Sequence, residues 1–351
     1  MQVIVSPFEV NKRVPLTISR GTTARSKNIW VRIVAEGIEG WGETSPFSIG
    51  QHAQAADALL QEFSALIPQL EPFHPLERQQ LEATLSSASS AVRAGIDVAL
   101  HDWLGKRSGL PLWQLWGLDR KKIGPTAVTV GLNSPEKALE RLRQWQQQVP
   151  TVRSIKVKLG SPAGVEADQA MMTAVLSEVS ADAKISVDAN GGWDLAGAIA
   201  MADWLAERGV TYIEQPLPVT LDDQLGTLTA RSPLPIFVDE SCFNTQDIPR
   251  LAEQVQGINI KLMKAGGLSE ALRMIHTAQA CHLQVMFGCY SDSAVSNTAL
   301  AHLAPLADHL DLDSHLNLIN DPFKGATIQS GCLYPNELPG LGLTRDELPE
   351  S

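Results

Sequence analysis

Five charged residues at nearly even intervals constrain the fold of this chain most strongly. They are Lys158, Asp188, Glu214, Asp239 and Lys264, and successive members lie about 25 to 30 residues apart. Each ends a short apolar run, such as SIKVKLG, KISVDANGG or VTYIEQP. Such a repeat is typical of a parallel barrel, where one strand and one helix alternate and every strand ends on the same face. We therefore expect the five side chains to converge at one rim.

Three parts of the chain differ in pattern. Residues 1–122 read as strands followed by helices, which is typical of an α+β module. Residues 123–317 alternate strand candidates with amphipathic stretches, and residues 318–351 are rich in Gly and Pro. The strand candidates are TAVTVG, SIKVKL, KISVD, TYIEQ, PIFVDE, GINIKL, LQVMFG and HLDLD.

These patterns predict an α/β fold: a (β/α) barrel of eight strands, an α+β module, and a C-terminal segment that returns to that module. An open doubly wound sheet is less favoured, because no GxGxxG motif follows the first strand of the alternating part.

Composition excludes several classes of partner. The formal net charge of −11 argues against nucleic acid and anionic membranes. The N-terminus has no signal-peptide pattern, and no apolar run approaches the roughly 18 residues of a membrane span. The four cysteines form neither a CxxC pair nor a zinc spacing, so we expect reduced thiols in a cytoplasmic protein. The sequence leaves a homo-oligomer open.

Three carboxylates end consecutive strand candidates: Asp188, Glu214 and Asp239. Any one of them alone reads as a helix cap or a rim salt bridge. The same position on three neighbouring strands instead favours a shared cation, and oxygen ligands suit Mg²⁺. Zinc is less favoured because no His or Cys joins the set. Asn190 shares strand parity with Asp188, so we expect it in the same layer.

Lysines flank the carboxylates. Lys156 and Lys158 alternate along one strand candidate and are expected to face the barrel interior together, where a lysine is costly unless it is paired or functional. We expect two adjacent ammonium groups beside a cation to lower each other's pKa, as a general base near neutral pH requires. Lys264 follows the sixth strand candidate and is expected to face Lys158 across the barrel. For Lys261, a salt bridge and a site role are equally favoured.

Asp311 and Asp313 share one face of the eighth strand candidate. Two interpretations are open: the pair caps the following turn, or it binds a cationic group of the substrate.

Together these motifs resemble the enolase superfamily and, within it, the muconate lactonizing enzyme subgroup. The resemblance rests on KVK, VDAN, EQP, VDES and KLMKAGG, and on the stretch AVRAGIDVALHDWLGKRSGLPL. It implies a TIM barrel of the modified (β/α)7β type with an α+β capping domain. It further implies that Asp188, Glu214 and Asp239 bind one Mg²⁺. It also implies that Lys158 and Lys264 are the acid–base groups and that Lys156 contacts the substrate carboxylate. VMFGCYSDS offers no counterpart to the strand-seven His of the mandelate racemase subgroup.

Within that subgroup the chain most resembles the dipeptide epimerases. PLTISRG, NIWVRI and GWGETSP resemble the start of their capping domain. Asp311-Leu312-Asp313 resembles their DxD motif, which binds the α-ammonium of the dipeptide. Arg20 takes about the place of an arginine that engages the glutamyl side chain in members acting on Ala-Glu. The resemblance implies a Mg²⁺-dependent L-Ala-D/L-Glu epimerase that uses two-lysine 1,1-proton transfer through an enediolate.

Two departures and three alternatives accompany this resemblance. Ser314-His315 follows the DxD where relatives often have a small residue and Pro, and the capping loop also carries Arg25 and Lys27, whose roles the sequence does not assign. An o-succinylbenzoate synthase or cycloisomerase would share the metal ligands but need no ammonium site. A Schiff-base lysine aldolase, from a different class, would need no metal. A binding barrel without turnover is least favoured, because two opposed lysines would have no purpose in it.

Overall fold

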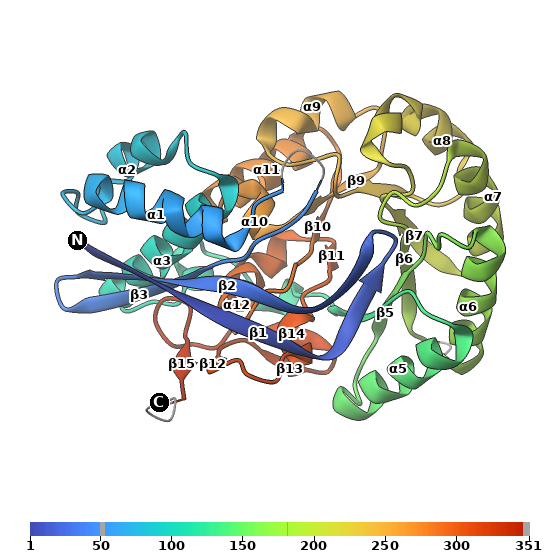
Figure 1. The fold of residues 1–351 in the computed structure, drawn as a ribbon, viewed down its shortest axis with the longest axis horizontal. Helices are drawn as coiled ribbons and strands as arrows, with labels where there is room; N and C mark the ends of the chain where they lie inside the picture. The colour runs from blue at the N-terminus through green and yellow to red at the C-terminus, as the bar shows by residue number, and fades with distance from the viewer. Residues whose placement is uncertain (50–52, 181, 347–351) are drawn as a thin grey trace.

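The computed structural model describes residues 1–49, 53–180 and 182–346, and it shows a β/α barrel beside a smaller N-terminal module (Figure 1). The module begins with a three-stranded antiparallel sheet in the order β1-β2-β3. Its strands are β1 (Gln2–Ile18), β2 (Gly21–Ala35) and β3 (Ile38–Thr44). Its helices are α1 (Ala56–Leu70), α2 (Arg78–Leu85), α3 (Ser90–Ser108) and α4 (Leu112–Leu115).

Local sequence explains how this module closes. Glu36 and Gly37 both have positive φ, 54° and 74°, as a two-residue hairpin turn between β2 and β3 requires. Helix α3 then lies against β3 at close range, because a Cβ atom at Gly42 would sit 2.1 Å from the carbonyl oxygen of Gly95. The antiparallel sheet and the long buried helix together form the α+β module that the sequence predicts.

Eight parallel strands form the barrel, in unbroken sequence order from β4 to β11. They are β4 (Ala127–Val130), β5 (Ser154–Lys158), β6 (Lys184–Asp188), β7 (Val210–Glu214), β8 (Ile236–Val238), β9 (Gly257–Ile260), β10 (Gln284–Phe287) and β11 (His309–Leu310). A parallel bridge between Thr126 and Leu310 joins the last strand to the first. All eight strand candidates of the sequence analysis are therefore confirmed.

Helices cover the outside of the barrel between successive strands. They are α5 (Pro135–Gln148), α6 (Val165–Glu178), α7 (Leu195–Ala206), α8 (Leu225–Arg231), α9 (Ile248–Leu251), α10 (Leu262–Ala265), α11 (Leu268–Ala280) and α12 (Ala294–Leu303). After β11, no α-helix follows in the described part of the chain, so seven β/α units and one further strand close the barrel. This is the predicted (β/α)7β form.

The strand register sets charged side chains level with one another at the carboxyl rim. Lys158 on β5 pairs with Asp188 on β6, and Asp188 pairs with Glu214 on β7. Glu214 in turn pairs with Phe237 on β8, two residues before Asp239. The backbone therefore brings together residues that lie far apart in the sequence.

The hairpin formed by β1 and β2 reaches from the capping module to this rim (Figure 1). At its tip, Ser19 and Arg20 both donate hydrogen bonds to the carbonyl oxygen of Asn190. After the barrel, the chain forms β12 (Phe323–Lys324), β13 (Thr327–Gln329), β14 (Cys332–Tyr334) and β15 (Thr344–Arg345). The Phe323 ring centre lies 4.2 Å from that of Trp30 on the capping sheet, so the last segment contacts the first module.

Candidate active site

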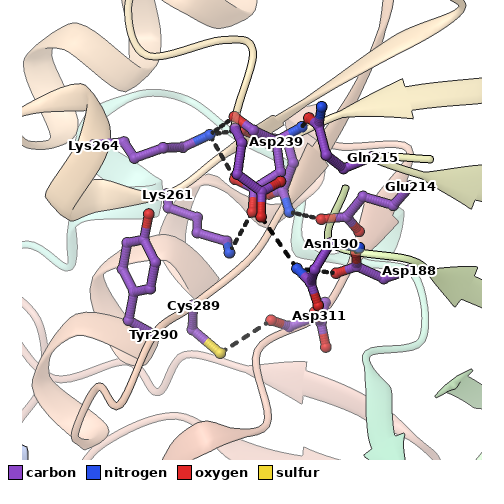
Figure 2. Close-up of polar contacts among 12 residues, drawn as sticks. Asp188, Asn190, Glu214, Gln215, Asp239, Lys261, Lys264, Cys289, Tyr290 and Asp311 are labelled. Atoms are coloured by element: carbon purple, nitrogen blue, oxygen red, sulfur yellow. Dashed lines mark hydrogen bonds and ion pairs between the residues drawn. The ribbon is translucent and has the colours of Figure 1, made fainter. Parts of the chain in front are cut away.

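Three buried carboxylates stand at the ends of neighbouring strands. Asp188 and Glu214 are the last residues of β6 and β7, and Asp239 directly follows β8. All three are at most 1% exposed. Asn190 lies beside them and donates to Asp188 Oδ2 at 3.3 Å and to Glu240 Oε1 at 3.2 Å. The sequence prediction that these strand ends converge is consistent with this placement (Figure 2).

Lys156 lies beneath the carboxylates and neutralises them. Its Nζ lies 2.5 Å from Glu214 Oε2, 2.7 Å from Asp311 Oδ2 and 3.3 Å from Asp188 Oδ2. Burial alone would lower the pKa of Lys156, but the Asp311, Glu214 and Asp188 carboxylates outweigh burial and raise it well above its ordinary value. This direction is opposite to the one expected for two ammonium groups beside a bound cation. Three carboxylates from other strands surround this lysine and determine the shift.

Lys158 is slightly more exposed to solvent than Lys156. Its Nζ is 2.5 Å from Asp188 Oδ2. Burial would raise the pKa of Asp188, but Lys158 and then Lys156 hold it at about 2, so this carboxylate is ionised. Lys158 lines two cavities above the rim, whereas Lys156 is completely buried.

Two lysines near β9 meet Asp239, but they do so differently (Figure 2). Lys261 Nζ lies 2.7 Å from Asp239 Oδ2 and 4.5 Å from the centre of the Tyr290 ring. Lys264 Nζ contacts Asp239 Oδ1 at 2.6 Å and donates to the carbonyl oxygens of Asp239, Cys242 and Asn259. Lys264 is thus held among backbone carbonyls within the wall of the barrel.

This arrangement contradicts the expectation that Lys264 faces Lys158 across the site. The side chain that shares a cavity with Lys158 is Lys261. Strand alternation could have indicated this, because Lys261 has the parity of Asn259, whose amide donates to Glu214 Oε1 at 2.7 Å. Lys264 falls beyond the strand, in the short helix α10.

Two cavities meet above the rim. The central cavity, of about 510 Å³, lies between the capping hairpin and the barrel, and it is lined by Arg20, Asn190, Lys158 and Lys261 among others. The side cavity, of about 190 Å³, is lined by residues of β1, α5 and the end of β11. The two cavities share Lys12, Leu16, Lys158, Cys289 and Tyr290.

Asp311 and Asp313 both line the side cavity. Asp311 accepts from Thr129 Oγ1 at 3.2 Å as well as from Lys156, and Asp313 Oδ2 accepts from the backbone N–H of Thr129 at 2.7 Å. Burial, and then the Asp311 carboxylate, raise the pKa of Asp313 to about 6. Asp311 and Asp313 thus form an adjacent pair at the cavity wall, and burial destabilises the charged form of Asp313. Such a pair is suited to a cationic ligand.

Arg20 extends from the capping hairpin to the barrel. Its Nη1 lies 2.6 Å from Glu240 Oε1 and donates to the carbonyl oxygen of Asn190 at 2.9 Å. The guanidinium is therefore already engaged by an acid of the barrel, which the sequence analysis did not predict. On the following strand, β2, Arg25 lines the central cavity, while Lys27 forms an exposed ion pair with Asp57 at 2.8 Å.

The donor set matches a hard cation. Burial, and then the nearby Asp188 carboxylate, raise the pKa of Glu214 to about 7, which shows that these acids repel one another. Glu214 Oε2 and Asp239 Oδ1 are buried and make no hydrogen bond, although ammonium groups lie close to both. A cation among the three acids would reduce their mutual repulsion. It would also give the two oxygens that lack a hydrogen bond a partner.

Within the described ranges, however, no three His, Cys, Asp or Glu side chains are grouped so that they could hold a metal as they stand. The ammonium groups of Lys156, Lys158 and Lys261 lie between the acids, so metal binding would require side chains to shift. Within the same ranges, no helix is long and apolar enough to cross a membrane.

Several known proteins resemble this chain along nearly its whole length. The chain is 43% identical over 335 residues to the hydrophobic dipeptide epimerase of Flavobacteria bacterium strain MS024-2A, with 95% of each chain covered. Its structure matches that of the L-Ala-D/L-Glu epimerase from Bacillus subtilis with a TM-score of 0.92 and 26% identity, covering 99% of each chain. It also matches the dipeptide epimerase from Cytophaga hutchinsonii complexed with Mg and D-Ala-L-Val (TM-score 0.90, 28% identity, covering 99% of this chain and 96% of that one).

Family models cover most of the chain. A model described as the mandelate racemase / muconate lactonizing enzyme N-terminal domain matches residues 1–117, and one described as enolase C-terminal domain-like matches residues 137–348. With the barrel, the capping sheet and the acids at the rim, these matches show that the chain belongs to the mandelate racemase and muconate lactonizing enzyme family of the enolase superfamily.

Proposed function

We propose that this protein is a Mg²⁺-dependent dipeptide epimerase that inverts the α-carbon of the C-terminal residue. The observation that carries the proposal is one central cavity with Lys158 and Lys261 in its wall, at the edge of three buried carboxylates. The relatives named as dipeptide epimerases support the same activity.

Asp188, Glu214 and Asp239 are the residues that would hold Mg²⁺. When bound, the ion supplies Lewis-acid stabilisation of negative charge that develops on the substrate carboxylate. Lys156 contributes its fixed positive charge from below, since it contacts two of these acids and is completely buried. It stabilises the acid cluster and contributes positive potential there.

Lys158 and Lys261 are the proposed acid–base pair. One of them removes the α-proton, and the other returns a proton to the opposite face, which inverts the configuration. Because each lysine is held by a different acid, Lys158 by Asp188 and Lys261 by Asp239, the two ammonium groups are kept apart. We propose Lys261 in place of Lys264, whose ammonium is occupied by backbone carbonyls.

Asp311 and Asp313 are the proposed site for the free α-ammonium of the dipeptide. They line the side cavity, which adjoins the central cavity at Lys158. A group held there lies next to the proposed base. An o-succinylbenzoate synthase or cycloisomerase needs no ammonium site, so this pair favours a dipeptide. N-acetylation of the substrate should therefore abolish its turnover.

Two classes of C-terminal residue are the candidates. L-Ala-D/L-Glu is favoured by Arg20 and Arg25 at the central cavity. A dipeptide with an apolar C-terminal residue is favoured by the ion pair of Arg20 with Glu240, which uses part of the guanidinium and cancels its charge. A guanidinium free to bind the substrate should make Ala-Glu at least about tenfold better than Ala-Gln, whereas a neutralised one should make Ala-Leu the best of the three.

α-Deuteration of dipeptides in D₂O with Mg²⁺, followed by mass spectrometry, tests the function. We expect one deuterium at the C-terminal α-carbon, loss of the reaction with EDTA, and recovery on adding Mg²⁺. Activity that survives EDTA, or a lysine trapped by borohydride, would instead support a Schiff-base aldolase. The cytoplasmic location and the homo-oligomeric state stay predictions.

A further inference from the structure

Lys12 is a cation at the junction of the site that the mechanism proposed above does not use. Lys12 lies on β1, where the pairing with β2 becomes irregular between Asn11 and Leu16. This strand passes over the barrel, and Lys12 lines both the central and the side cavity together with Lys158. It therefore stands at the junction of the two cavities.

Lys12 differs from the other lysines of the site in having no partner. Lys156, Lys158, Lys261 and Lys264 each form an ion pair with at least one acid. The backbone of Lys12 bridges to Leu318, but the Lys12 side chain makes no hydrogen bond and no ion pair with any residue in the described part of the chain. Burial lowers its pKa, even though Cys289, Asp313 and Asp292 act in the opposite direction. A half-buried ammonium without a partner is suited to an anionic ligand.

The charges of the side cavity are arranged in two parts. Asp311 and Asp313 form its acidic wall. Elsewhere its described lining carries one acid, Glu140, and four cations: Lys12, Lys137, Arg141 and Lys158. A ligand that matches this lining has a positive group at the aspartates and a negative group toward Lys12.

We propose that Lys12 selects an acidic side chain on the N-terminal residue of the dipeptide. The inference rests on the proposed function, because the aspartates must hold the α-ammonium of that residue. Its side chain then extends from the same α-carbon within the side cavity, whose volume of about 190 Å³ suits one short side chain. Aspartyl and glutamyl residues carry both required charges on a single residue.

An isosteric pair of substrates tests this inference. L-Glu-L-Leu and L-Gln-L-Leu differ only in the charge of the first side chain, and α-deuteration of the leucine reports turnover of each. We expect wild-type kcat/KM to be at least about tenfold higher for L-Glu-L-Leu. In Lys12→Met the ratio should fall to about one, and Lys12→Arg should restore most of it.

Lys184→Met is the matched control, because Lys184 is exposed at the first residue of β6, at the other end of the barrel. Its ratio should equal that of the wild type. The inference is overturned if the wild type does not discriminate between the two dipeptides, a comparison that needs no variant. It is also overturned if Lys12→Met lowers both values equally.

Failure of the function itself would look different. If no dipeptide is deuterated, L-Ala-L-Glu and L-Ala-L-Leu included, the proposed function is wrong and this inference falls with it. If those two are deuterated while Glu and Gln at the first position are not distinguished, only the role of Lys12 is wrong.

Discussion

The barrel rim and the capping hairpin differ in how far their positively charged side chains are paired with acids of the protein. At the rim every ammonium group has a carboxylate partner, and Lys156 alone lies within 3.3 Å of three acids. On the hairpin, Lys12 has no partner among the described residues, and Arg20 is held through only one of its nitrogens. The rim is thus neutralised within the protein, whereas the hairpin offers charge to a ligand. The comparison indicates that the rim carries the chemistry and the hairpin the selection of substrate.

Changing a rim acid should have the largest effect. Glu214→Gln keeps an acceptor for the amide of Asn259 but removes one of three proposed Mg²⁺ ligands. We expect kcat to fall by at least about 1,000-fold, because charge stabilisation in the transition state is lost. Steady-state kinetics of dipeptide epimerisation measures this, with circular dichroism as the control for folding. Near-normal turnover would remove Glu214 from the metal site.

Lys264→Met should affect stability more than substrate binding. The change leaves the carbonyl oxygens of Asp239, Cys242 and Asn259 without their charged donor. Breaking such a buried ionic contact costs about 3 kcal/mol or more. Urea unfolding should show this loss, and Lys261→Met should lose less stability because its ammonium borders the cavity. The reverse order would argue that Lys264 is the more accessible lysine.

Ionisation of Asp313 should make the stability of the protein depend on pH. Its pKa is raised from 3.8 to about 6, so the folded protein binds this proton more tightly than the unfolded chain does. Ionisation of Asp313 therefore lowers the free energy of unfolding as pH rises from about 4 to 6. Asp313→Asn removes this charge and should raise the free energy of unfolding at pH 7 by roughly 1–3 kcal/mol.

Binding should respond in the opposite sense. Protonated Asp313 cannot pair with an α-ammonium, so kcat/KM should fall as pH drops below about 6, and Asp313→Asn should lower it about 10- to 100-fold at pH 7. A pH profile of wild type and variant checks both statements. An unchanged kcat/KM in the variant would leave the ammonium site to Asp311 alone.

The hairpin should give the smallest effect. Arg20→Met removes a contact with Glu240 that is partly exposed. If the second residue of the substrate is apolar, the Ala-Leu rate should change by less than about tenfold. A loss confined to Ala-Glu would instead show that Arg20 binds the substrate.

The barrel rim could largely be predicted from the sequence, whereas the contacts of the capping hairpin could not. The rim residues are fixed by strand length and strand parity, so the barrel and the positions of Asp188, Glu214 and Asp239 could be predicted. The position of the Lys264 side chain could not be predicted, because strand alternation no longer applies after β9 ends at Ile260. The hairpin contacts could not be predicted, since the pairing of Arg20 with Glu240 depends on how two modules pack across 220 residues of sequence.

The most direct test of the central claim is α-proton exchange in Lys158→Ala and Lys261→Ala, each assayed in D₂O with both configurations of the C-terminal residue. Two lysines on opposite faces predict that neither variant epimerises the dipeptide. They also predict that each variant exchanges the α-proton of one configuration only, and that the two variants retain opposite configurations. Full epimerisation by Lys261→Ala would contradict the account. So would the loss of exchange for one configuration in Lys264→Ala with normal folding, together with no loss in Lys261→Ala.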